Sequence, residues 1–186
     1  MINIAVLVSG GGTNLQALID AQQAGKIENG RIAFVVSSNP DAFALERAAK
    51  AGIPSAVLRR REFASPDAYG AALDALLRER EIGLVVLAGF MTVLSADFCR
   101  RYENRIINIH PSLIPAFCGE GFYGLRVHEA ALAKGVKVTG ATDVYKRQGK
   151  THEKPYRLSV DDQLPPAADP QAERDEPPAE RGGAVF

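Results

Sequence analysis

The sequence contains no tryptophan and only two cysteines, Cys99 and Cys118, among its 186 residues. Their spacing fits neither a metal site nor a redox pair, so we expect no metal ion and two reduced thiols in a cytoplasmic protein. Positive charge is not in excess, because Lys+Arg and Asp+Glu both number 22. This balance gives no indication of a nucleic acid or an acidic membrane as partner. No apolar run approaches the roughly 18 residues that a membrane span needs.

Up to residue 142, short apolar segments alternate regularly with amphipathic ones. Runs such as residues 4–8 are typical of buried parallel strands, whereas residues 65–80 begin with the Ser-Pro pair that favours a helix start. The predicted strands are residues 4–8, 32–36, 55–58, 84–87, 106–109 and 136–142, and the predicted helices are residues 14–24, 42–51, 66–80, 96–102 and 125–134. This alternation predicts an α/β fold with an open, mostly parallel, doubly wound sheet.

A glycine-rich segment, Ser-Gly-Gly-Gly-Thr-Asn at residues 9–14, joins the first predicted strand to the first helix. Glycines let the backbone approach a ligand closely, and the N-terminus of the following helix favours an anion. No Gly-Lys-Ser/Thr follows, and Leu15 stands where a dinucleotide fingerprint needs its last glycine. A phosphate monoester therefore fits better than a dinucleotide. From these residues alone, a tight turn that merely needs glycine remains an equal alternative.

The second candidate segment carries Asn108 and His110 at the end of the fifth predicted strand. The two-residue period of a strand puts both side chains on the same side of the chain. An amide and an imidazole placed together can hydrogen-bond a developing oxyanion and move a proton. A single histidine bonded to a backbone carbonyl would be the ordinary alternative. The asparagine two residues earlier favours a functional interpretation.

The third candidate is the apolar segment LAGFMTVL at residues 87–94, which leaves the fourth predicted strand. Such a segment can form a wall for a flat ring system, although ordinary core packing explains it as well. If the first and fourth strands are neighbours, all three segments meet where open parallel sheets bind ligands. His128 and His152 have no partner by spacing and are assigned structural or solvated roles. Residues 59–61, three arginines, are interpreted as a solvated turn, with attraction of a polyanion as the alternative.

Three segments, VLVSGGGTNLQALID, VVLAGFMTVLS and INIHPSLIPAF, resemble the glycinamide ribonucleotide formyltransferases, and the resemblance covers residues 1–142. It implies a Rossmann-type formyltransferase domain and transfer of a formyl group from 10-formyltetrahydrofolate, a co-substrate of one-carbon metabolism, to the amine of glycinamide ribonucleotide. That reaction belongs to de novo purine (IMP) biosynthesis. Both partners are small molecules, with no nucleic acid and no membrane involved.

The resemblance also implies roles for individual residues. Gly12, Thr13 and Asn14 would hold the phosphate end of the ribonucleotide. The folate pocket would be lined by Met91, Thr92, Val93, Leu94 and Asn108. His110 would act as general acid, with Asn108 as its partner in stabilising the oxyanion.

The sequence departs from the family at several positions. Thr92 and Pro66 stand where many or some members carry an arginine, and in Pro66's case a folate-contacting one. The family's catalytic aspartate, which supports the charged form of the histidine, would align near Thr151, and the segments around Asp161 and Asp162 do not match its surroundings.

From Asp143 onward both the resemblance and the periodicity end, and residues 143–186 hold six of the eleven prolines. We expect this stretch to be a disordered tail, because it lacks periodicity and its part from Pro165 to Arg181 is charged, Pro-rich and poor in large apolar residues. Its first six residues, Asp-Val-Tyr-Lys-Arg-Gln, are also those that one reading frame of transposase mosaic-end adapter DNA encodes, so an artefactual origin is the second hypothesis. We further expect an unpaired sheet edge at the sixth strand, exposed apolar surface, poor folding and impaired activity.

Three alternative functions remain. A formyltetrahydrofolate hydrolase and a methionyl-tRNA formyltransferase share the Asn/His chemistry, although the first normally has an additional N-terminal domain and the second an additional C-terminal one. The third alternative is a truncated remnant that binds nucleotide or folate without catalysis, which the missing aspartate favours.

Overall fold

The structure, a computed structural model, describes residues 1–119, 121–145 and 152–155. The chain divides into two units, Met1–Tyr156 and Arg157–Phe186, and the second lies outside the described residues. The elements are β1 (Ile2–Val8), α1 (Thr13–Gln23), β2 (Gly30–Ser37), α2 (Phe43–Lys50), β3 (Ser55–Val57), the 3-10 turn η1 (Arg60–Glu62), α3 (Pro66–Glu79), β4 (Ile82–Leu87), α4 (Ala96–Arg101), β5 (Ile106–His110), α5 (Leu125–Ala133), β6 (Thr142–Tyr145) and β7 (His152–Pro155).

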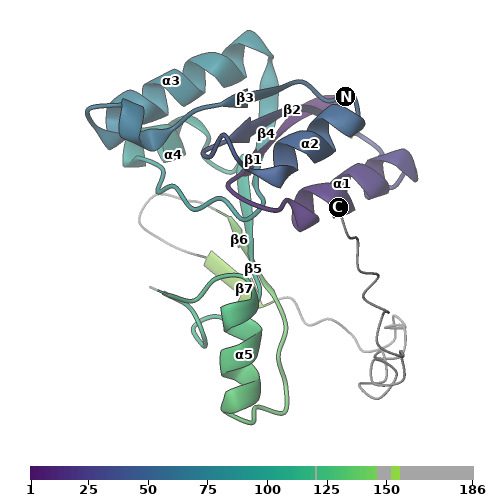
Figure 1. Cartoon of the computed structure of the whole chain (residues 1–186), viewed down its shortest axis with the longest axis vertical. Coiled ribbons are helices and arrows are strands. Elements are labelled where there is room, and N and C mark those ends of the chain that lie inside the picture. Colours follow the sequence, from purple (N-terminus) through teal and green to yellow (C-terminus); the bar gives the residue numbers. More distant parts are fainter. Residues whose placement is uncertain (120, 146–151, 156–186) are drawn as a thin grey trace, which may run out of the picture. The chain divides into compact units, whose positions relative to one another are not determined.

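The strands form one sheet in the order β3-β2-β1-β4-β5-β6-β7 (Figure 1). The five strands β1 to β5 pair in parallel, and β6 and β7 are antiparallel to their neighbours. This confirms the predicted mostly parallel α/β sheet. Because β1 lies between β2 and β4, the strand order reverses there, and such a reversal opens a crevice at the carboxyl ends of the strands.

Helices cover both faces of the parallel sheet, with α1 and α2 on one face and α3 and α4 on the other (Figure 1). The alternation of side chains along β1 sends Leu7 into the layer under α3 and α4, and Val6 and Val8 into the layer under α1 and α2. Both layers are closed by fully buried side chains, including Tyr69, Leu73, Leu77 and Phe98 in the first and Leu15, Ile19, Ala44 and Ala48 in the second.

The predicted helix starts at the two serines are confirmed. The Ser65 hydroxyl accepts a hydrogen bond from the Ala68 N–H at 3.0 Å, and Pro66 occupies the first position of α3. The Ser95 hydroxyl accepts from the Phe98 N–H at 3.2 Å at the start of α4. Such caps satisfy an N–H group that has no partner within the helix. Within the described residues, no helix is long and apolar enough to span a membrane.

The predicted strand at residues 136–142 is wrong, because β6 begins only at Thr142. Residue 136 instead lies in the turn that follows α5, where the Val136 N–H donates to the Ala131 carbonyl at 3.3 Å, and Val138 is 76% exposed. Thr142 pairs with His110 at the end of β5 and is buried by contacts described below.

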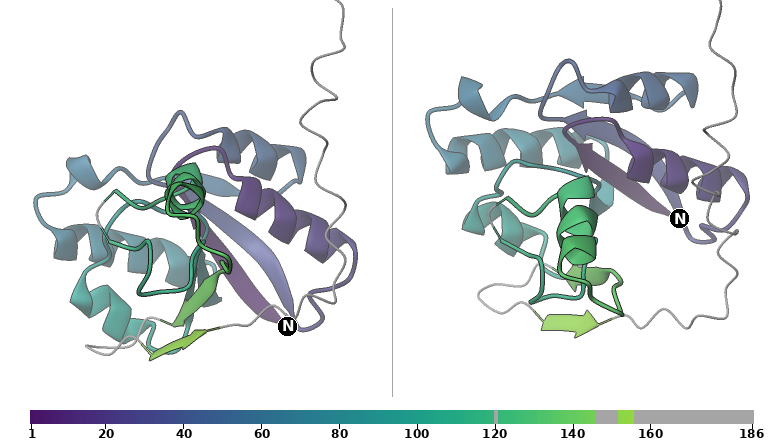
Figure 2. Two further views of the ribbon diagram at one scale, coloured as in Figure 1. Left: turned by 90° about the horizontal axis from the view of Figure 1, so that it is seen from below. Right: turned by 60° about the horizontal axis from the view of Figure 1, so that its bottom comes forward.

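Two strands also lie in the region where no regular element is expected. Residues 143–145 continue β6, and β7 pairs with it from Thr142 opposite Pro155 to Tyr145 opposite His152 (Figure 2). The expected unpaired edge at the sixth strand is therefore wrong for β6. The expectation of disorder for the rest of the tail concerns residues 146–151 and 156–186, which lie outside the described residues.

Candidate functional site

Three loops that leave the carboxyl ends of β1, β4 and β5 meet at one cavity of about 590 Å³. A volume of this size suits a small organic ligand. The lining comprises residues 10–14 after β1, residues 88–91 after β4, residues 108–111 from β5, residues 122–124 before α5, and His128 and Ala141. The three candidate segments of the sequence thus contribute to one site, as the strand order requires.

The glycine loop can adopt its path only because residue 12 has no side chain. Gly12 has a φ of 72°, and a Cβ atom there would lie 2.6 Å from the Cβ of Ala44. The loop is held against α2, because the Ala44 N–H donates to the Gly10 carbonyl at 3.1 Å and Arg47 Nε donates to the Gly11 carbonyl at 2.9 Å. These bonds occupy two carbonyl groups of the loop.

The same arrangement leaves hydrogen-bond donors at the cavity. The first N–H groups of α1 have no partner within the helix by geometry, and the helix dipole makes this end positive. Thr13 and Asn14 line the cavity and are exposed to solvent. Arg47 adds a positive charge behind the loop, a contribution for which the sequence offers no local signal because 36 residues separate it from Gly11. The loop can therefore receive an anionic group.

Of the four residues predicted for the folate wall after β4, only Met91 lines this cavity. Its N–H donates to the Ser9 hydroxyl at 2.9 Å, and its side chain is 57% exposed. Thr92 lines a neighbouring pocket, Val93 is 84% exposed, and Leu94 packs against the core under α3 and α4. Ala88, Gly89 and Phe90 complete this wall.

Asn108 and His110 both line the cavity, in accord with their predicted placement on one side of β5. The Nε2 atom of His110 lies 2.9 Å from the carbonyl oxygen of Phe117. A carbonyl oxygen can only accept, so Nε2 carries the proton of this bond whether or not Nδ1 is also protonated. The amide of Asn108 supplies a further donor at the same strand end.

Two buried hydroxyl groups hold the turn that carries the Phe117 carbonyl. Thr142 Oγ1 donates to the Ser112 carbonyl at 2.7 Å and accepts from the Ile114 N–H at 2.9 Å. Ser112 Oγ donates to the Ala116 carbonyl at 2.6 Å. Because both side chains are buried, water does not reach these polar groups, and the bonds within the protein satisfy them instead. The orientation of His110 therefore depends on β6 through Thr142.

The sequence interpretation missed five cavity residues, namely Phe122, Tyr123, Gly124, His128 and Ala141. His128 was assigned a structural or solvated role, yet it lies one helical turn after Gly124 and lines the same cavity. No local pattern places α5 against the end of β5, so periodicity alone could not bring these residues to the site. Among the described residues, no group of three or more His, Cys, Asp or Glu side chains is arranged to hold a metal ion.

The parallel α/β sheet thus carries a glycine loop and an Asn/His pair at the carboxyl ends of its strands, around one cavity. Residues 2–149 match the family described as "Formyl transferase". The chain therefore belongs to the formyl transferase family, which confirms the class predicted from its three segments.

Individual relatives narrow the comparison. The chain is 43% identical over 141 residues to a phosphoribosylglycinamide formyltransferase of Escherichia coli, covering 76% of this chain and 64% of that protein. It is 44% identical over 140 residues to a trifunctional purine biosynthetic protein, adenosine-3, of Drosophila melanogaster, covering 75% of this chain and 10% of that protein. The crystal structure of glycinamide ribonucleotide transformylase 1 from Symbiobacterium toebii superposes with a TM-score of 0.71 at 40% identity, covering 83% of this chain and 74% of that one. The chain thus spans less than two thirds of the length of these two curated relatives.

Proposed function

We propose that this protein transfers the formyl group of 10-formyltetrahydrofolate to the amine of glycinamide ribonucleotide, the formylation step of de novo purine biosynthesis. The observation that carries the proposal is the meeting of an anion loop, an apolar wall and an Asn/His pair in one cavity. The names of the relatives support the choice of substrates. Because both substrates are small soluble metabolites, the proposal places the reaction in the cytoplasm.

The glycine loop is the proposed site of the ribonucleotide phosphate. Thr13, Asn14 and the first N–H groups of α1 supply donors, and the helix N-terminus and Arg47 supply positive potential. Gly12 is required for this loop conformation, since its positive φ and the contact with Ala44 exclude a larger residue. The phosphate would anchor the substrate so that its amine lies toward β5.

The folate co-substrate would lie along the wall formed by residues 88–91, in the cavity that Phe122 and Tyr123 also line. This wall combines backbone groups with apolar surface, which suits a flat ring that carries polar edges. When bound, the co-substrate supplies an activated formyl group. Thr92, Val93 and Leu94 would act through the path of the loop, because they lie outside this cavity.

Asn108 and His110 are the proposed catalytic residues. When an amine attacks a formyl carbon, negative charge develops on the formyl oxygen. Donors that already point at this position stabilise the charge without reorganisation. The Asn108 amide can donate one hydrogen bond there, and the protonated His110 imidazolium, whose Nε2–H is taken by the Phe117 carbonyl, can donate another from Nδ1. As the bond between the formyl carbon and the folate nitrogen breaks, this proton goes to the leaving nitrogen, and the neutral imidazole takes up the proton that the attacking amine loses. The bond from His110 Nε2 to the Phe117 carbonyl keeps the ring in a defined orientation.

The test is formyl transfer measured in single turnovers, with protein in excess over labelled 10-formyltetrahydrofolate and glycinamide ribonucleotide present. These conditions detect slow chemistry, which matters because the segment aligned with the family's catalytic aspartate differs in this chain. We expect the wild-type protein to form formylglycinamide ribonucleotide, and His110→Ala to lower the rate by roughly 100- to 1,000-fold. Binding of both ligands, followed by calorimetry, should change little in His110→Ala.

A second variant separates binding from chemistry. Thr13→Val should weaken glycinamide ribonucleotide binding and leave folate binding unchanged, because Thr13 belongs to the anion loop. Equal rates for wild type and His110→Ala would contradict the proposed role of the Asn/His pair. Formate release without formylated amine would identify a hydrolase, and binding of both ligands without product would identify a non-catalytic remnant.

A further inference from the structure

Helix α2 bonds two successive carbonyl groups of the glycine loop. The Ala44 N–H donates to the Gly10 carbonyl at 3.1 Å, and Arg47 Nε donates to the Gly11 carbonyl at 2.9 Å. The helix that carries these donors lies beside α1, the helix that the loop enters (Figure 1). Two neighbouring peptide groups of the loop are therefore fixed from the side of α2.

Each of these bonds also gives a direction to an N–H group. Both peptides are trans, and in a trans peptide the carbonyl oxygen and the N–H of the next residue point to opposite sides. Because the carbonyls of Gly10 and Gly11 point toward α2, the N–H groups of Gly11 and Gly12 point away from it. In the part of the chain that the structure describes, neither N–H has a hydrogen-bond partner, and both glycines line the cavity. Successive free N–H groups of this kind form a concavity that binds anions.

The guanidinium group of Arg47 is itself held by its surroundings. Its Nη1 donates to Gln16 Oε1 at 3.0 Å, and Gln16 Nε2 donates to Asp20 Oδ1 at 2.8 Å, so the Gln16 oxygen faces Arg47. The guanidinium also lies over the ring of Phe43, 5.0 Å from its centroid. No carboxylate among the described residues pairs with Arg47. Its charge therefore acts on the Gly11 carbonyl, and such a charge-assisted bond is stronger than a neutral one.

From these contacts we propose that Arg47 is a positioning residue of the glycine loop, which turns the N–H of Gly12 toward a bound anion. Arg47 is not among the residues that line the cavity, and it lies on the carbonyl side of the peptide whose N–H side meets the ligand. A charged donor on the carbonyl also polarises the peptide, which makes its N–H a stronger donor. The proposal rests on the function proposed above, in which the anion is the phosphate of the ribonucleotide.

The first experiment compares the affinities of the wild type, Arg47→Gln and Arg47→Lys for glycinamide ribonucleotide by calorimetry. Arg47→Gln should bind about 10-fold more weakly, as the loss of a bond from a charged group implies. Arg47→Lys should lose nearly as much, because lysine keeps the charge but cannot donate to the Gly11 carbonyl and the Gln16 amide together. Folate binding and the single-turnover rate at saturating ribonucleotide should change little. Arg31→Gln is the matched control, because Arg31 lies on β2 and bonds Asn3.

The second experiment follows the backbone N–H resonances of Gly11 and Gly12 by NMR while inorganic phosphate is added. In the wild type both resonances should shift downfield, because both groups donate to the anion. In Arg47→Gln the shift of Gly12 should shrink more than that of Gly11, because the Gly10 carbonyl keeps its bond from the Ala44 N–H. A general loss of positive potential would reduce both shifts alike, so the ratio of the two shifts reports the orientation of one peptide.

The outcomes separate this proposal from the proposed function. Wild-type affinity for the ribonucleotide in Arg47→Lys, or an equal reduction of the two N–H shifts in Arg47→Gln, would overturn the positioning role, because charge alone would then explain the effect. Arg47-dependent phosphate shifts without any binding of glycinamide ribonucleotide would support the positioning role and contradict the proposed substrate. The absence of phosphate shifts and of ribonucleotide binding in the wild type would overturn both.

Discussion

Residues 1–106 and residues 107–155 of this chain are stabilised in different ways. In the first region, two apolar layers enclose the parallel sheet, and many side chains in them are fully buried. In the described part of the second region, the buried apolar residues are Val127 and Ala131, and the exposed large ones include Leu125, Leu132 and Val138. The second region is instead held by buried hydroxyls, above all those of Ser112 and Thr142. The first region thus supplies stability, whereas the second orients a reactive side chain through polar contacts.

The largest expected effect is on the core of the first region. Leu73 is fully buried between α3 and the sheet, so Leu73→Ala should lower the free energy of unfolding by about 2–5 kcal/mol. Leu132 on α5 is 81% exposed, and Leu132→Ala, the matched control, should change it by less than about 0.5 kcal/mol. Denaturant unfolding measures both. Equal losses in the two variants would mean that α5 is covered in solution and that the contrast between the regions is not real.

An intermediate effect is expected where the second region depends on polar contacts. Thr142→Val keeps the shape of the side chain but leaves the Ser112 carbonyl and the Ile114 N–H without their partner, at a cost of about 1–3 kcal/mol. The His110 ring resonances should shift in NMR spectra, because the turn that carries the Phe117 carbonyl loses its support. Thr139→Val provides the control on an exposed threonine nearby. An unchanged His110 spectrum in Thr142→Val would mean that the orientation of the ring does not depend on β6.

The smallest expected effect concerns a polar atom inside the first region. The Tyr69 hydroxyl is buried, and no hydrogen-bond partner for it occurs among the described residues. Tyr69→Phe should therefore raise the free energy of unfolding by about 1 kcal/mol. Tyr102→Phe should lower it instead, because the Tyr102 hydroxyl bonds Asp74. A loss of stability in Tyr69→Phe would reveal a partner for that hydroxyl.

The same two tyrosines predict the alkaline behaviour of the first region. Burial raises the pKa of Tyr69 to about 12, against the opposing effect of Arg60, and burial together with Asp74 raises the pKa of Tyr102 to about 12. In the unfolded chain both titrate near their ordinary value of about 10. Their contribution to stability is thus fully present below pH 10 and is lost as the pH rises toward 12. Tyr69→Phe should unfold less steeply with pH in that range, as followed by circular dichroism.

The fold could be predicted from the sequence because its local signals agree with one another. Apolar runs mark the buried strands, and Ser65 and Ser95 mark two helix starts that the structure confirms. For the site, the two-residue period of strands and the shared carboxyl edge of a parallel sheet predicted that Asn108, His110 and the glycine loop lie close together. All of them line the cavity. These features depend on short stretches of chain, and short-range rules are enough to place them.

The rest of the site depends on contacts between distant residues. Met91 is placed by the Ser9 hydroxyl 82 residues away, and the next residue, Thr92, lines a neighbouring pocket instead of the cavity. His128 reaches the cavity because of how α5 packs, which periodicity does not encode. The strand expected before Thr142 failed because long-range bonds to Ser112 and Ile114 decide where β6 begins. For residues 143–186, resequencing the gene across codon 143 tests the foreign-origin hypothesis, and an uninterrupted natural reading frame would contradict it.

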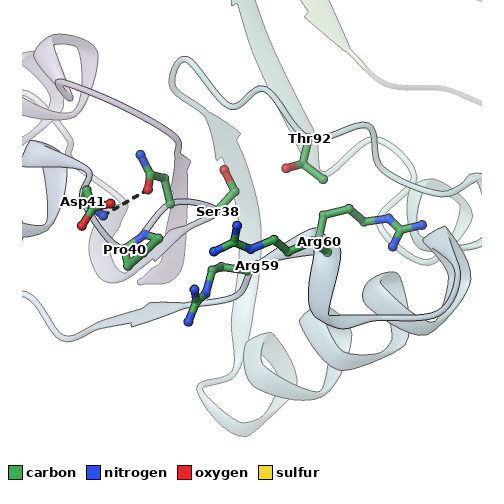
Figure 3. A pocket seen from close by; sticks show the side chains of 8 residues that line it. Ser38, Pro40, Asp41, Arg59, Arg60 and Thr92 are labelled. Carbon is green, nitrogen blue, oxygen red and sulfur yellow. Dashed lines mark hydrogen bonds between the residues drawn. The ribbon is translucent and has the colours of Figure 1, made fainter.

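The hydroxyl of Ser9 has a thermodynamic consequence. It is a shared partner of Met91, which lines the cavity, and of Ser38, which lines the neighbouring pocket formed by residues 38–41, residues 59–61 and Thr92 (Figure 3). A ligand that strengthens or breaks one of these bonds changes the affinity of the other pocket for its own ligand, if the two bonds of the Ser9 hydroxyl depend on each other. Any such coupling must be reciprocal, so a ligand of the neighbouring pocket that tightens binding in the cavity by some factor is itself bound more tightly by the same factor when the cavity is occupied. A single serine would then be enough to make two neighbouring pockets cooperative.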